Sequence, residues 1–173
     1  MAGSSRTTPH RLPPRWRKLL LSTHVATSVG LLGTDATVLL LATEGARGSE
    51  PATVYPAAQL IGALLLVPLA LVSLTTGIGL GLLTPWGLLR HWWVTAKLAL
   101  TTAGAVLALV VLTPTLSGLA AASRSGDAIA LGDRLELVRD SGAACLVLLV
   151  TVGLSVYKPF GRIRKSSVTA RAT

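Results

Sequence analysis

The chain has 173 residues, about one domain's length, and 51% of them are hydrophobic while only 13% are charged. An average soluble domain carries about 25% charged residues, so this composition does not fit a water-soluble globule. The mean hydropathy of +0.64 indicates lipid as the solvent. A net charge of +9 on a soluble protein would suggest nucleic acid, but the basic residues flank long apolar stretches, so we expect no nucleic-acid partner.

Four stretches of the chain are long and apolar enough to cross a bilayer, whose hydrocarbon core takes about 20 helical residues. They cover residues 18–42, 56–83, 91–121 and 135–157, with boundaries good to a few residues. Pro68 and Pro114 lie inside two of these stretches and should kink or end their helices. We therefore predict an all-α fold, an integral membrane four-helix bundle over residues 16–161, between flexible basic tails at 1–15 and 162–173.

The placement of Lys and Arg predicts the orientation of the bundle, because short loops rich in these residues stay in the cytoplasm. They concentrate in both tails, at Arg6, Arg11, Arg15, Arg17, Lys18, Lys158, Arg162, Arg164, Lys165 and Arg171. Both termini are therefore expected to be cytoplasmic, in a multi-pass protein of the plasma membrane. The basic tails should be attracted to anionic lipid headgroups. The first stretch is too long for the apolar region of a signal peptide, so we expect an uncleaved span.

Polar residues inside the expected spans are few, and each is a candidate for function because lipid makes such groups costly. His24, Ser28 and Asp35 share one face of the first helix by their spacing. Counted at 1.5 Å per residue, His24, Lys97 and Thr151 lie about 9 to 10 Å from the cytoplasmic face. They are predicted to line one polar pocket. The alternatives are a neutral, hydrogen-bonded packing role for His24 and a Lys97 amine that reaches back to the interface.

Asp35 and Arg139 are predicted to form a structural ion pair near the outer boundary of the membrane. The same count places them about 26 and 27 Å from the cytoplasmic face. If they pair, removal of Asp35 alone should destabilise the bundle, because it leaves an uncompensated charge in a medium of low dielectric constant.

Motifs of soluble enzymes are missing from the sequence. It has no nucleophile elbow, no phosphate-binding loop and no paired carboxylates. The single cysteine, Cys145, excludes a disulfide framework within the chain. The three histidines, His10, His24 and His91, are too dispersed to indicate a zinc site. We therefore assign no catalytic residue, and the sequence favours a protein that is not an enzyme.

Two segments resemble a family of small actinobacterial membrane proteins of unknown function. The first joins Ser73-Leu74-Thr75-Thr76-Gly77 to Thr84-Pro85-Trp86-Gly87-Leu88-Leu89-Arg90-His91-Trp92-Trp93-Val94 and Lys97-Leu98. The second is the ending Ser155-Val156-Tyr157-Lys158-Pro159-Phe160-Gly161. The resemblance covers nearly all four spans. Such proteins are distantly similar to the copper-resistance CopD domain and to HemJ, the membrane protoporphyrinogen oxidase.

This resemblance implies a histidine in the first span, a later Trp/Lys signature and, as in the oxidase, a bound haem b. His24 and Lys97 occupy those two positions, so His24 would be the metal ligand and Lys97 would meet a haem propionate. His91, the remaining candidate for a second axial ligand, lies about 9 Å shallower than His24 by helix rise. The first span lacks the aromatic residues of the oxidase, so the oxidase activity is not transferred.

Two functions from different classes follow from the sequence. In the first, the protein is a binding or structural component of the plasma membrane without catalytic activity, whose partner is a protein, a lipid or an ion. In the second, it is a redox protein that binds a b-type haem at His24. The sequence identifies neither the ligand nor the oligomeric state.

Overall fold

The computed structural model describes residues 13–83 and 92–157, and within them it confirms an all-α bundle. Four of its helical segments are long and apolar enough to cross a membrane. The first is α1 (Pro14–Arg47). The second combines α2 (Pro51–Ile61), the π-helical turn η1 (Gly62–Leu66) and α3 (Val67–Leu83). The third combines α4 (Trp92–Leu107), the π-helical turn η2 (Ala108–Leu112) and α5 (Thr113–Ser125), and the fourth is α6 (Leu131–Tyr157).

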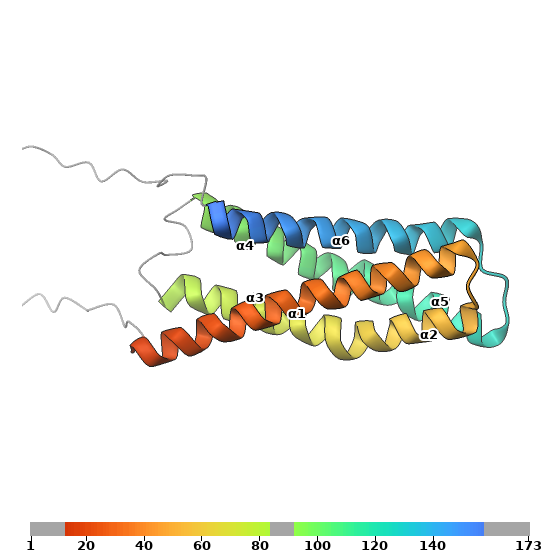
Figure 1. Ribbon diagram of the computed structural model, residues 1–173, viewed down its shortest axis with the longest axis horizontal. Helices are drawn as coiled ribbons and strands as arrows, with labels where there is room; N and C mark the ends of the chain where they lie inside the picture. The colour runs from red at the N-terminus through yellow and green to blue at the C-terminus, as the bar shows by residue number, and fades with distance from the viewer. Residues whose placement is uncertain (1–12, 84–91, 158–173) are drawn as a thin grey trace, which may run out of the picture.

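The four segments run up and down in chain order and pack as a closed ring (Figure 1). α1 begins and α6 ends at the same end of the bundle, which we call the terminal end. The opposite end, the loop end, holds the two short connections 48–50 and 126–130. Because short connections join antiparallel neighbours, this order follows from the loop lengths.

A glycine follows each of the two helices, α1 and α5, whose C-terminal ends lie at the loop end. Gly48 after α1 and Gly126 after α5 adopt positive φ values of 104° and 77°. At Gly48 this left-handed turn lets its backbone N–H and that of Ser49 bond to the last carbonyls of α1. Such a conformation is strained for residues with a Cβ, which is why glycine stands at both turns.

Each of the four expected spans corresponds to one helical segment, but the segments are longer than the apolar stretches alone predicted. α1 extends from 14 to 47 instead of 18–42, and the second segment begins at 51 instead of 56. Hydropathy marks only the part of a helix that crosses hydrocarbon, whereas polar turns continue the helix beyond it. Of the expected tails at 1–15 and 162–173, residues 1–12 and 162–173 lie outside the described residues, whereas Pro14 and Arg15 belong to α1.

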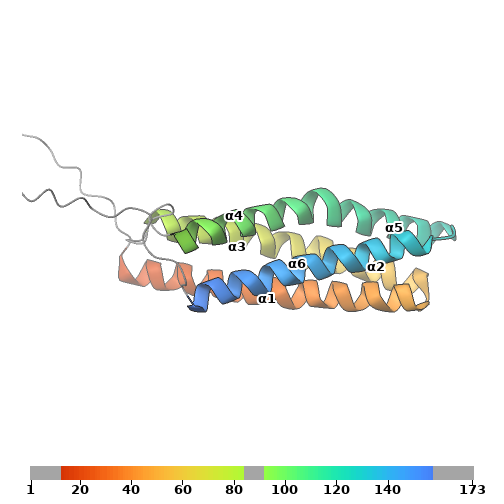
Figure 2. The ribbon, with the colours of Figure 1, turned by 90° about the horizontal axis from the view of Figure 1, so that it is seen from above.

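The prolines inside the second and third segments coincide with the two π-helical turns. η1 ends two residues before Pro68, and η2 ends two residues before Pro114. A proline ring collides with the carbonyl four residues earlier, and a π-helical turn moves that carbonyl away. Each segment therefore changes its helical geometry at the proline and continues, as expected for a membrane helix. In Figure 2 the third segment arches where α4 passes into α5.

α1 is the element on which the bundle is assembled, because α2, α3 and α6 all pack against it. α6 contacts α1 far more than it contacts α5. The buried core includes Val38 and Ala42 of α1, Tyr55 and Ala58 of α2, and Leu137 of α6, all fully buried. Many leucines and valines on the outer faces of the helices stay exposed, as lipid-facing side chains do.

Gly45 of α1 permits the closest approach between α1 and α2. A Cβ placed at this position would lie 2.7 Å from the hydroxyl oxygen of Tyr55, whose side chain is fully buried and cannot retreat. Tyr55 therefore packs against bare backbone, in the manner of small residues at membrane helix interfaces.

We predict that Gly45→Ala destabilises the bundle by about 1–3 kcal/mol, because overpacking displaces Tyr55. The matched control is Gly33→Ala on the same helix, where no atom lies within 4 Å of the added Cβ. That control should be neutral or stabilised by up to about 1 kcal/mol. Thermal melting in detergent measures both, and equal melting temperatures would contradict the predicted contact.

Candidate functional site

The imidazole of His24 is held by α3 through its Nδ1 atom. Nδ1 lies 3.0 Å from the backbone carbonyl oxygen of Ser73 and 3.1 Å from the hydroxyl oxygen of Thr76. A carbonyl only accepts, so Nδ1 carries the proton and donates it. The Thr76 hydroxyl in turn donates to the carbonyl of Val72, at 2.6 Å. In a neutral ring this arrangement leaves Nε2 as an acceptor, and Nε2 has no hydrogen-bond partner among the described residues.

A second polar contact joins the same two helices one turn further into the bundle. The hydroxyl groups of Ser28 and Ser73 lie 2.8 Å apart, and Ser73 is buried. Ser73 thus makes two hydrogen bonds to α1: its carbonyl accepts from His24, and its hydroxyl bonds to Ser28. Hydrogen bonds of this kind between membrane helices determine the register in which they pack.

Gly77 provides the space in which the His24 ring lies. A Cβ at position 77 would be 3.0 Å from Cε1 of the imidazole and 3.5 Å from Nδ1. Ser73 and Thr76 thus bond the Nδ1 edge of the ring, and Gly77 leaves room beside that edge. We call these three residues and His24 the histidine cradle.

Lys97 lies on α4 and donates a hydrogen bond across to α6. Its Nζ atom is 2.7 Å from the hydroxyl oxygen of Ser155, which donates to the carbonyl of Thr151 at 2.8 Å. The Thr151 hydroxyl is buried and donates to the carbonyl of Leu148 in its own helix. An ammonium has three donors, so Lys97 retains two that no described residue accepts.

The predicted polar pocket of His24, Lys97 and Thr151 becomes two hydrogen-bonded groups in the structure. The Lys97 ammonium lies within electrostatic range of the His24 imidazole. Their hydrogen bonds nevertheless go to different helices, α3 and α6. Neither residue has a carboxylate partner among the described residues. His91 lies outside the described residues, so its predicted place beside His24 stays a prediction.

The predicted ion pair between Asp35 and Arg139 is wrong. Asp35 is only 1% exposed, and neither of its carboxylate oxygens has a hydrogen-bond partner among the described residues. The side chain that acts on it is the thiol of Cys145 on α6.

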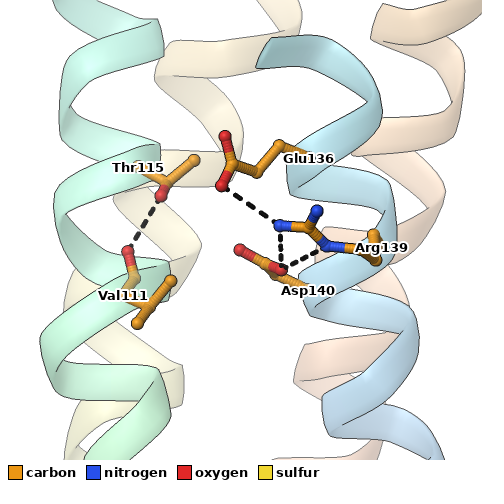
Figure 3. Close-up of polar contacts among 5 residues, drawn as sticks. All are labelled: Val111, Thr115, Glu136, Arg139 and Asp140. Carbon is orange, nitrogen blue, oxygen red and sulfur yellow. Dashed lines mark hydrogen bonds and ion pairs between the residues drawn. The ribbon is translucent and has the colours of Figure 1, made fainter. Parts of the chain in front are cut away.

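Arg139 bonds to acidic neighbours on its own helix instead. Its guanidinium lies 3.1 Å from a carboxylate oxygen of Glu136 and 3.1 Å from one of Asp140 (Figure 3). The Arg139 side chain is 68% exposed, so it faces away from the core that holds Asp35. Cys145, and not Arg139, is the α6 residue beside Asp35, and Arg139 lies six residues nearer the loop end, so the two side chains differ in depth as well as in direction.

Clusters of three or more His, Cys, Asp or Glu residues that could hold a metal ion do not occur among residues 13–83 and 92–157. Any metal bound through His24 would therefore need ligands from elsewhere, such as a cofactor. Scans against protein-family models, curated proteins and solved structures found no match to this chain. The resemblance to the CopD and HemJ group thus stays a prediction from the sequence.

Sequence reasoning missed the residues that hold the site together. Ser73, Thr76 and Ser155 were recognised only as parts of the two segments that carry the family resemblance. Their hydrogen bonds to His24 and Lys97 cross from one helix to another, and such bonds depend on helix rotation. The signal that was available is the concentration of hydroxyl residues at the depth of His24.

We predict that the Ser28–Ser73 hydrogen bond contributes measurably to packing of α1 on α3. A double-mutant cycle with Ser28→Ala and Ser73→Ala should give a coupling energy of about 0.6 kcal/mol, the typical value between membrane helices. For comparison, Thr37→Ala combined with Ser73→Ala should be additive, because Thr37 is exposed and bonds only to its own helix. A coupling energy of zero in the first cycle would show that the Ser28–Ser73 hydrogen bond does not stabilise the packing of α1 on α3.

Proposed function

We propose that this chain is a plasma-membrane protein without catalytic activity that binds the phosphate of an anionic lipid headgroup at its terminal end. The single observation that carries the proposal is the half-buried ammonium of Lys97. It donates to one neutral hydroxyl and keeps two donors and a full charge that no described carboxylate balances. An uncompensated charge at a protein–lipid boundary is costly unless a counter-ion meets it.

A lipid phosphate supplies that counter-ion at the right place. Lys97 lies five residues inside α4, so it is about 8 Å from the helix start at Trp92. The basic residues of both tails favour this end as the cytoplasmic one, where anionic lipids are attracted to Lys and Arg. His24 lies within electrostatic range of the same ammonium, and its Nε2 has no hydrogen-bond partner among residues 13–83 and 92–157. The site would therefore combine a cation with a neutral polar group.

The test is the amount of anionic phospholipid that remains bound after purification in mild detergent. We expect Lys97→Gln to lose bound phosphatidylglycerol severalfold, because the amide keeps a hydrogen bond to Ser155 but carries no charge. Lys97→Arg should retain the lipid. The matched control is Lys18→Gln, which removes an exposed lysine from the same end of the bundle. Equal lipid retention in Lys97→Gln and Lys18→Gln would overturn the proposal.

A second candidate function, binding of haem b, is favoured by the orientation of His24. Histidines that ligate iron commonly donate Nδ1–H to a backbone carbonyl, which fixes the tautomer and presents Nε2 to the metal. His24 makes this bond to Ser73, so it fits one requirement of an axial ligand. Lys97 would meet a propionate. When bound, the haem would supply electron-transfer chemistry that no described side chain supplies.

A visible spectrum distinguishes this candidate from lipid binding. The protein, expressed with a haem precursor and purified, should show a Soret band and a positive pyridine haemochrome reaction if it binds haem. His24→Ala should then lose the band, whereas Ser28→Ala, which removes a neighbouring hydrogen bond, should keep it. A wild-type protein without a Soret band, or an equal band in His24→Ala, would remove His24 as a haem ligand.

A further inference from the structure

Asp35 stands out because it is a carboxyl group in the interior of a membrane-spanning bundle with nothing to balance it. It is 1% exposed, and both of its oxygens are buried without a hydrogen-bond partner among the described residues. Twelve residues separate it from the end of α1 at Arg47, so it lies about 18 Å from the loop end of that helix. The carboxyl group is therefore fully inside the protein.

The elements packed against α1 present one titratable group to Asp35. That group is the thiol of Cys145 on α6. η1 and α3 contain no titratable residue, and the titratable residue of α2, Tyr55, lies beside Gly45, ten residues further along α1. His24 is eleven residues away on α1 itself, about 16 Å by helix rise.

The remaining charged residues of α6 lie further toward the loop end. They are Asp133, Arg134, Glu136, Arg139 and Asp140. The nearest cation among them, Arg139, is exposed and bonded to Glu136 and Asp140. Asp35 thus has no described cation that could neutralise it.

Ionised and neutral forms of a carboxyl group make different demands on such a site. A carboxylate buried in low dielectric requires several donors or a cation, whereas a carboxylic acid requires only one hydrogen-bond partner. The titratable neighbour that the described residues offer Asp35 is the Cys145 thiol, and they offer it no cation. Such a site costs a neutral acid far less than it costs the anion.

We propose that Asp35 is a proton-binding site inside the bundle, where its carboxyl group holds a proton against the thiol of Cys145. Proton uptake adds one proton to a carboxylate oxygen and releases nothing, so no oxidant or reductant takes part. The proton is exchanged with the loop end, since Asp35 lies about 18 Å from that end of α1 and about 32 Å from the terminal end. Carboxyl groups within membrane spans are rare and commonly serve as proton or ion sites.

Infrared spectroscopy of the whole protein in detergent at neutral pH tests this assignment directly. The wild type should show the C=O stretching band of a protonated carboxylic acid, and Asp35→Asn should lack it. Glu50→Gln, which removes an exposed carboxylate, should leave the band unchanged. In Cys145→Ala the band should persist at a shifted frequency, because the acid has lost its thiol neighbour. A wild-type protein without the acid band would overturn the proposal.

Thermal stability provides a second, independent measurement. The folded state holds a proton that the unfolded chain releases, so stability of the wild type should fall as pH rises. The melting temperature of Asp35→Asn should fall less over the same pH range. This replaces the earlier expectation, based on an ion pair, that loss of Asp35 destabilises the bundle. Identical pH profiles would contradict proton binding. Stabilisation of the wild type by Na⁺, at constant ionic strength and absent in Asp35→Asn, would show a cation site and overturn the proposal as well.

Discussion

Polar side chains inside a bilayer cannot turn to water, and the packing of this bundle follows from that constraint. His24 and Ser28 bond to α3, and Lys97 bonds from α4 to α6. These contacts lie in the half of the bundle near the terminal end, where two pairs of helices are joined by hydrogen bonds. In the other half, Arg124 of α5 donates to Gln59 of α2 and Arg134 of α6 donates to the carbonyl of Gly45, beside the closely packed apolar core. Hydrogen bonds between helices thus occur in both halves of the bundle.

The helices themselves could be predicted well from the sequence, because hydropathy and helix length are both set by the thickness of the bilayer. The prolines at 68 and 114 also indicated where the helices would change geometry. The sequence did not reveal that a π-helical turn would precede each proline and that the helix would continue beyond it. That outcome depends on neighbouring helices and on side chains such as Thr113, whose hydroxyl bonds to the carbonyl of Ala108.

The candidate site was predicted only in part, for a geometric reason. Depth along a helix is a matter of counting residues, and that count predicts one layer for His24, Lys97 and Thr151. The direction of a side chain around the helix axis depends on how each helix is rotated against its neighbours. Apolar faces determine this rotation only loosely in lipid, where every face is apolar. Asp35 and Arg139 differ in both respects, because Arg139 lies nearer the loop end and its side chain points out of the bundle.

The close approach of His24 to Gly77 also limits which residues related chains can carry at these two positions. The imidazole occupies the space beside the α3 backbone that a methyl group at position 77 would enter. A relative of this chain that acquires alanine or a larger residue there would press on the ring and weaken its bond to Ser73. Positions 24 and 77 should therefore change together in descent, with histidine at the first accompanied by glycine at the second. Such paired retention would identify descendants that preserve the same cradle even where the remaining sequence has diverged.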